Sequence, residues 1–137
     1  MRRSFPDSGV LIDAARGLPP YDRIAFEYFN SPDRIFLTSP LVRLETVPKA
    51  AYLRLQAELD FYEAFFNHPE VEYCGEWERL EETADRAARQ FGLSAMDALH
   101  IAAAYLLGAD ELVTTERPSK PIYRNRLVEV VYLYANL

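Results

Sequence analysis

The chain has 137 residues, which is the length of one ordinary domain with a hydrophobic core of its own. Half of the residues are hydrophobic and 26% are charged, which excludes a disordered chain. The 15 Lys and Arg against 21 Asp and Glu give a net charge of −6, which excludes a uniformly basic nucleic-acid-binding surface but not a local one. We therefore expect a single domain over residues 1–137.

The predicted elements alternate between short β-rich runs and segments with apolar residues at helical spacing. Several of the helical segments end at a glycine. The elements are, in chain order, a strand ending between Phe5 and Asp7, a helix ended by Gly17, a helix over 21–30, a strand over 34–38, a helical piece from Pro40 to Glu45, a long helix over 50–67, a weak strand over 70–74, a helix over 76–91, a small-residue helix over 94–107, and strands over 111–115 and 127–133.

Strands that alternate with helices favour an α/β fold with a largely parallel sheet. In such sheets the functional side chains gather beyond the carboxyl ends of the strands. The helix over 76–91 is amphipathic, and its apolar face is expected to carry Trp77, Leu80, Ala84, Ala87 and Ala88.

The cysteine content and the N-terminus indicate the compartment. Cys74 is the only cysteine, so no internal disulfide can form, and we expect a small buried side chain there. Residues 1–7 are too polar for a secretory signal, and no stretch approaches the roughly 20 apolar residues of a membrane span. These features predict a cytoplasmic protein without a membrane segment.

Four carboxylates stand where a parallel sheet can gather them. Asp7 lies between the first strand and the first helix, and Glu45 follows the second strand. Asp97 lies in the first turn of the small-residue helix, and Glu116 directly follows a strand. Ionised carboxylates in one pocket raise one another's pKa unless a cation neutralises them, and Mg²⁺ or Mn²⁺ prefers such oxygen ligands. Because no His or Lys base is evident among them, the set indicates metal-dependent phosphodiester hydrolysis.

Each of these carboxylates also has a purely structural interpretation. Asp97 stands three residues after Ser94, so the two can form a capping box at the start of a helix. Asp7 can cap the first helix, Glu45 can be a solvated helix residue, and Glu116 can belong to a loop. The functional interpretation depends on the four occurring together.

Three segments surround these carboxylates: PDSGVLIDAARG, SPLVRLETV and GLSAMDALHIAAAYLLGADELVTTE. Their order and distances resemble those of the PIN-domain nucleases, over nearly the whole chain and most strongly from Gly92 to Glu116. The resemblance implies a three-layer α/β/α sandwich with a mostly parallel central sheet. It also implies an endoribonuclease that uses Mg²⁺ or Mn²⁺, with the toxin of a VapBC-type toxin–antitoxin pair as the commonest bacterial example. The partners that it implies are an RNA substrate, an antitoxin protein and a second copy of the chain in a homodimer.

The acidic residues of this family correspond to positions in the chain. The first Asp-Thr/Ser pair of the family corresponds to Asp7 and Ser8, the second acid to Glu45, and the third to Asp97. The resemblance implies that these carboxylates bind metal and are catalytic, with Ser8 in support.

Three positions depart from the family's pattern. The Thr-x-Asp motif corresponds to Thr114 and Glu116, so a side chain one methylene longer stands where Asp is commoner. Gly9 stands where the family often has Asn, which removes one polar group beside Asp7, and Pro6 removes a backbone donor. Because no carboxylate is lost, the resemblance still implies that Glu116 is a metal-binding, catalytic residue supported by Thr114.

Other side chains near these motifs have two interpretations each. His100 can pair with Asp97 as a metal ligand, but we expect a hydrogen-bonded, half-buried side chain. Phe61 and Phe65, one turn apart, either belong to the core or dock a partner subunit or an antitoxin segment. A basic stretch after Glu116 either contacts RNA phosphates or forms a solvated loop. Its members are Arg117, Lys120, Arg124 and Arg126.

Two alternatives compete with the nuclease hypothesis. The first is a PIN-like binding module with weak or lost catalysis that acts through a protein or RNA partner, and Gly9 and Glu116 favour it. The second is a phosphatase of the haloacid-dehalogenase type, which needs a second Asp two residues after the first, where this chain has Gly9. We therefore favour the metal-dependent endoribonuclease.

Overall fold

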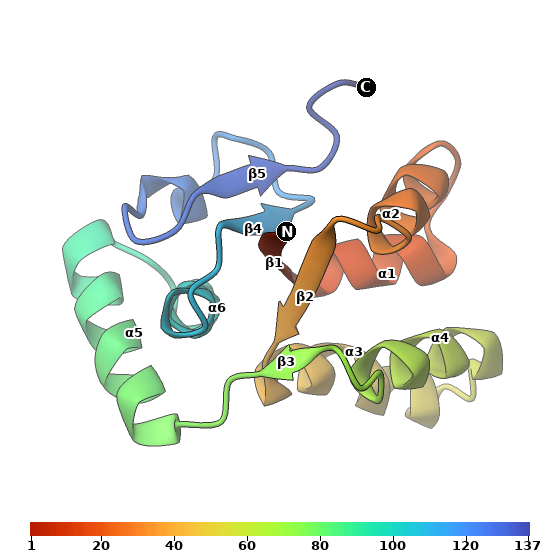
Figure 1. Cartoon of the computed structure of the whole chain (residues 1–137), viewed down its shortest axis with the longest axis horizontal. Helices are drawn as coiled ribbons and strands as arrows, with labels where there is room; N and C mark the ends of the chain where they lie inside the picture. Colours follow the sequence, from red (N-terminus) through yellow and green to blue (C-terminus); the bar gives the residue numbers. More distant parts are fainter.

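The computed structural model describes all 137 residues and contains five strands and six α-helices (Figure 1). The strands are β1 (Arg2–Pro6), β2 (Arg34–Thr38), β3 (Glu72–Tyr73), β4 (Glu111–Thr114) and β5 (Val130–Tyr132). The helices are α1 (Ser8–Arg16), α2 (Tyr21–Phe29), α3 (Pro40–Tyr52), α4 (Gln56–Phe66), α5 (Trp77–Phe91) and α6 (Ala95–Leu106), and a short 3₁₀ helix, η1 (Pro121–Arg124), precedes β5.

The five strands form one sheet in the order β3-β2-β1-β4-β5, and every neighbouring pair is parallel. Helices α1 to α4 lie on one face of the sheet, and α5 and α6 lie on the other (Figure 1). This arrangement follows from right-handed crossovers, because the chain moves outward from β1 to β3 and then returns past β1 to β4. The three-layer α/β/α architecture with a parallel sheet is thereby confirmed.

Local signals in the sequence explain where several helices begin and end. Asp7 caps α1, since its side chain accepts a hydrogen bond from Val10 N–H, and Ser39 caps α3 in the same way. Ser94 caps α6 through a bond from Asp97 N–H. Gly92 ends α5 with a φ of 66°, in the left-handed region that favours glycine.

The single long helix predicted over 50–67 is wrong. The segment is divided between the end of α3 and the whole of α4, with a turn centred on Arg54, whose φ is 56°. Arg54 N–H bonds to the Ala51 carbonyl at 3.1 Å and Leu55 N–H to the Ala50 carbonyl at 2.9 Å, which is the Schellman pattern of a helix end. The prediction failed because no glycine or proline marks this turn and the apolar spacing continues across it.

The weaker predictions differ from the structure in extent. The strand predicted over 70–74 is reduced to the two residues of β3, and that over 127–133 to the three of β5, while η1 was not predicted.

Trp77 was predicted on the apolar face of its helix, but this residue is 54% exposed. Trp77 is the first residue of α5, whereas Leu80 and Ala84 are buried as expected.

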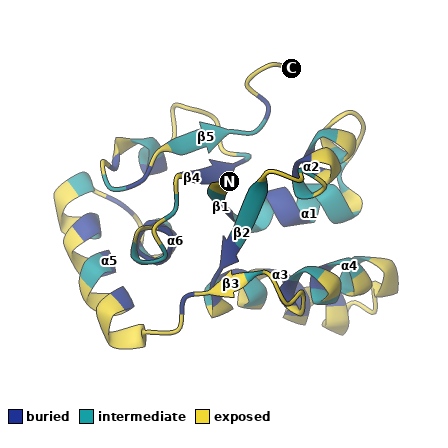
Figure 2. Cartoon of the chain, in the orientation of Figure 1, coloured by how far each residue is buried: buried dark blue, intermediate teal, exposed yellow.

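The core fills the space between the sheet and both helix layers (Figure 2). Its largest fully buried side chains include Phe5, Leu37 and Leu112 of the inner strands and Tyr62 of α4. Cys74 is buried as predicted. No helix combines the length and the apolar character that crossing a membrane requires.

A buried ion cluster joins the amino-terminal parts of the inner strands. Glu111, only 3% exposed, accepts hydrogen bonds from Ser4 at 2.6 Å, Arg2 at 2.9 Å and Arg34 at 3.0 Å. Although burial raises the pKa of Glu111, these three partners lower it further than burial raises it. The acid is therefore ionised and paired at this edge of the sheet.

We predict that Arg54→Gly stabilises the protein by about 0.5–1 kcal/mol, because glycine adopts the left-handed conformation without the steric cost of a side chain. Urea unfolding of the purified protein measures this difference. Arg54→Ala is the matched control, since it removes the same side chain but keeps the Cβ. Equal or lower stability of the glycine variant would contradict the helix break at Arg54.

Candidate functional site

Asp7 and Thr114 lie at the carboxyl ends of the adjacent strands β1 and β4. The Thr114 hydroxyl donates a hydrogen bond of 2.5 Å to Asp7 Oδ2, and Val10 N–H donates one of 3.2 Å to Asp7 Oδ1. Asp7 N–H in turn donates to the Val113 carbonyl at 2.9 Å. The carboxylate is therefore held from both of its oxygens at the edge of the sheet.

Glu116 is joined to Asp7 through the same threonine. Its backbone N–H donates to Thr114 Oγ1 at 3.0 Å, and its carbonyl accepts a 2.6 Å hydrogen bond from the Tyr123 hydroxyl of η1. The Glu116 backbone is thus tied on both sides while its side chain is exposed. Tyr123 was not among the predicted site residues, because nothing in the linear pattern links η1 to this end of the sheet.

The environment of Asp7 disfavours its charged form. Burial raises the pKa of Asp7 to about 6, and the negative charge of Glu116 raises it as well. The hydrogen bonds from Thr114 and Val10 and the nearby His100 act in the opposite direction but do not offset burial. Asp7 forms no salt bridge in the structure, so a bound cation would stabilise its ionised form.

Glu45 and His100 form a pair across α3 and α6. His100 Nε2 lies 2.7 Å from Glu45 Oε1, and the His100 ring is only 6% exposed. Burial raises the pKa of Glu45, but the hydrogen bond and charge of His100, together with the Ser8 hydroxyl, lower it overall. The prediction of a hydrogen-bonded histidine is confirmed, with Glu45 as its partner, but His100 is buried rather than half-buried. Its Nδ1 atom is buried without a hydrogen-bond partner.

Asp97 forms only half of a capping box. Its backbone N–H donates to Ser94 Oγ at 3.3 Å, as the cap of α6 requires, but the return bond from Ser94 N–H to the Asp97 carboxylate is absent. The structural interpretation therefore accounts for Ser94 and leaves the carboxylate of Asp97 unused. The half-buried Asp97 lies one helical turn from His100.

The donor set fits a hard divalent cation in its chemistry, although it does not form a closed cage. No three His, Cys, Asp or Glu side chains lie close enough together to hold a metal ion as they stand. Mg²⁺ does not require such a cage, because it usually binds one or two carboxylates and keeps several water ligands. The weakly compensated Asp7, beside the charge of Glu116, offers a carboxylate of this kind.

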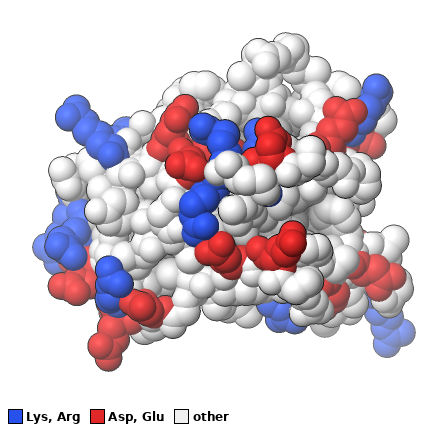
Figure 3. All heavy atoms as spheres, viewed as in Figure 1, with Lys and Arg blue, Asp and Glu red and all other residues white.

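Three of the four residues in the predicted basic stretch are exposed without salt bridges, and the fourth is hydrogen-bonded to the fold. Arg117, Lys120 and Arg126 are exposed and take part in none of the salt bridges, whereas Arg124 donates to the Gly92 carbonyl at 3.3 Å and so joins η1 to the turn before α6. On the face shown in Figure 3, charges of both signs alternate without a large basic patch. Any contact of these residues with RNA remains a prediction.

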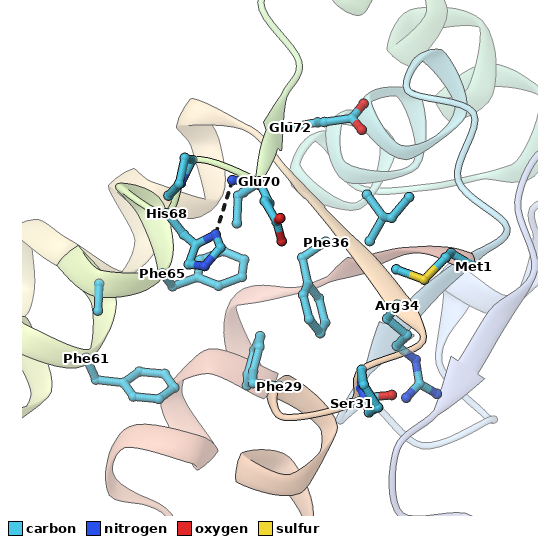
Figure 4. Close-up of a pocket in the computed structure, with 15 residues that line it drawn as sticks. Met1, Phe29, Ser31, Arg34, Phe36, Phe61, Phe65, His68, Glu70 and Glu72 are labelled. Atoms are coloured by element: carbon cyan, nitrogen blue, oxygen red, sulfur yellow. Dashed lines mark hydrogen bonds between the residues drawn. The ribbon is translucent and has the colours of Figure 1, made fainter.

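Phe61 and Phe65 belong both to the core margin and to an open groove between α2, β2 and α4 (Figure 4). Both side chains are half-buried, and their rings lie 5.9 and 5.4 Å from that of Phe29. The groove has a volume of about 780 Å³, and Phe36 also lines it. Its lining includes none of the four predicted carboxylates, so the groove is separate from them.

Comparisons with known proteins agree with this fold. The family model of the PIN domain matches residues 4–117. The crystal structure of FitAcB from Neisseria gonorrhoeae superposes with a TM-score of 0.68 and 14% identity, over 96% of this chain and 99% of that chain. The crystal structure of VapBC2 from Rickettsia felis, bound to a DNA fragment from their promoter, superposes with a TM-score of 0.69 and 14% identity, over 94% of this chain and 97% of that chain. None of the curated proteins matches the chain.

We predict that Asp7→Asn stabilises the protein at pH 8 by about 1–3 kcal/mol in the presence of EDTA. The folded-state pKa of about 6 lies above the ordinary value of 3.8, so wild-type Asp7 loses stability as the pH rises through this interval. Asn stays neutral at every pH and caps a helix as well as Asp. Urea unfolding at pH 4 and pH 8 measures the difference, which should disappear at the lower pH.

Glu81→Gln, which removes an exposed carboxylate from α5, provides the baseline for this comparison. If the Asp7→Asn variant is less stable than the wild type at pH 8, the negative charge of Asp7 must be stabilised by other groups in the folded protein.

Proposed function

We propose that this chain, which belongs to the PIN domain family, is an endonuclease that hydrolyses RNA phosphodiester bonds with the aid of Mg²⁺ or Mn²⁺. The observation that carries the proposal is the Thr114 hydroxyl, which links the uncompensated Asp7 to Glu116 at the carboxyl edge of a parallel sheet. Ligand sites of open parallel sheets lie at this edge.

Asp7, Glu45, Asp97 and Glu116 are the proposed metal-binding and catalytic residues. A divalent cation held by such carboxylates supplies a water of lowered pKa and positive charge for the leaving oxygen. Carboxylate oxygens are the ligands that Mg²⁺ and Mn²⁺ prefer, which agrees with the donor set at this edge.

The remaining side chains hold these carboxylates in place. Thr114 is fully buried, so its hydroxyl has a fixed position from which it orients Asp7 Oδ2. His100 holds Glu45 through Nε2 and, with Ser8, keeps that carboxylate ionised. These hydrogen bonds reduce the freedom of the carboxylates before any ligand binds, and partners of this kind tune metal sites strongly.

RNA as the substrate is proposed from the family resemblance and from the basic residues that follow Glu116. Arg117, Lys120 and Arg126 are exposed and lack salt-bridge partners, so they are free to neutralise backbone phosphates. Arg124 of η1 lies between them in sequence and is tied to Gly92.

The protein partner that we propose is an antitoxin, with this chain as the toxin of a VapBC-type pair in the cytoplasm. The similarity of the fold to that of VapBC2 supports the proposal. The groove beside Phe29, Phe61 and Phe65 offers an apolar surface on which an amphipathic segment of such a partner can dock. A homodimer is proposed from the family resemblance.

A second candidate function is a binding module of the same fold that acts through a protein or RNA partner. The observation that favours it is the lack of any three potential ligands close enough to hold a metal ion. Glu116, one methylene longer than Asp, and Gly9, without a side chain beside Asp7, agree with weakened catalysis.

The decisive experiment is cleavage of a mixed RNA pool by the purified protein, free of any antitoxin, with Mg²⁺ or Mn²⁺. We expect cutting that EDTA abolishes and that Asp97→Asn lowers by at least about 100-fold, because a carboxylate that would hold the cation is removed. Glu81→Gln, at an exposed position of α5, should cut like the wild type.

Single-stranded DNA of the same sequences tests the choice of substrate. Equal cutting of DNA would contradict specificity for RNA. Folded protein that cuts no RNA with either metal would contradict the nuclease and favour the binding module.

A further inference from the structure

Gly9 allows an unusually close approach of two segments at the candidate site. A Cβ added at Gly9 would lie 2.5 Å from the hydroxyl oxygen of Thr115 and 3.3 Å from Asp7 Oδ1. The first distance is shorter than real Cβ contacts allow, so any side chain at this position forces the Thr115 hydroxyl to move. The two oxygens therefore flank one point above the first turn of α1.

The backbone conformation of Gly9 does not require a glycine. The residue lies within α1 and is not among the residues with positive φ. Glycine in a helix is less favourable than alanine, so a position that needs no special conformation favours a side chain. At Gly9, the hydroxyl of Thr115 occupies the space that a side chain would need.

Two successive threonines thus lie near the candidate site. Thr114 donates to Asp7 Oδ2. The hydroxyl of the half-buried Thr115 and Asp7 Oδ1 both face the position of the missing Gly9 Cβ, at 2.5 and 3.3 Å from it, and Oδ1 accepts only the bond from Val10 N–H. Thr115 also precedes Glu116, so its position follows from the same strand end that holds both acids.

We propose that Thr115 is a positioning residue of this site: its hydroxyl, seated against Gly9, holds a water that is shared with Asp7 Oδ1 and thereby orients that oxygen toward the metal. This role rests on the proposed metal-dependent function. It also explains Gly9, since the hydroxyl of Thr115 occupies the space of the polar side chain that is missing beside Asp7.

The test is a double-substitution cycle on the full chain, with the Mn²⁺ dissociation constant measured by titration calorimetry and kcat and KM measured for RNA cleavage. Thr115→Val removes the hydroxyl at nearly constant volume, and we expect it to weaken Mn²⁺ binding about 10-fold and to lower kcat while KM for RNA stays unchanged. Thr115→Ser keeps the hydroxyl and should restore most of both.

Gly9→Ala should cause the same loss, because its Cβ displaces the hydroxyl of Thr115. In the Thr115→Val background it should add no further loss, since the hydroxyl is already gone. Gly75→Ala is the matched control, because a Cβ at Gly75 meets no atom within 4 Å. Melting temperatures of all variants confirm that they are folded.

Three results would overturn the proposal: wild-type Mn²⁺ affinity in Thr115→Val, equal losses in the Ser and Val variants, or additive losses in the double variant. The proposed function fails separately, and this role with it, if the wild-type protein neither binds Mn²⁺ nor cuts RNA. If the wild-type protein binds Mn²⁺ and Asp7→Asn abolishes that binding, the proposed function is supported. The double-substitution cycle then tests the role of Thr115 alone.

Discussion

The hydrogen bond between Thr114 and Asp7 is the interaction on which the candidate site depends. It joins the last residue of β4 to the residue that follows β1, across two parallel strands whose carboxyl ends share an edge. Thr114 is fully buried, so its hydroxyl cannot exchange this partner for bulk water. Because the same oxygen accepts the Glu116 N–H, one side chain sets the positions of two acids.

The inner strands carry one acid at each end, and the surroundings of the two acids differ. Glu111 is paired with Arg2 and Arg34, and its pKa is lowered. Asp7 has no cationic partner, and its pKa is raised to about 6. A half-buried carboxylate without a salt-bridge partner and with a raised pKa is more typical of a functional site than of a structural one. One end of the sheet thus pairs its acid with two arginines, whereas the acid at the other end has no salt-bridge partner.

Which features the sequence predicts depends on how local their causes are. The strand over 34–38, the cap of Ser94 and the end of α5 at Gly92 depend on neighbouring residues and were predicted. The end of α3 at Arg54 depends on a left-handed residue that is not glycine, and no sequence pattern announces it. The exposure of Trp77 likewise depends on where α5 begins relative to the sheet.

The sequence by itself determined the α/β class and the order of the elements and pointed to four candidate acids, because hydrophobic period, capping residues and motif spacing are properties of short segments. Only the tertiary structure decided which groups meet: the pairing of His100 with Glu45, the Tyr123 bond to the Glu116 backbone, and the seat of Thr115 against Gly9. Each of these contacts joins elements that are distant in the chain, and its geometry depends on strand register and helix packing. The spacing of residues along a sequence does not contain that information, which arises when the layers pack.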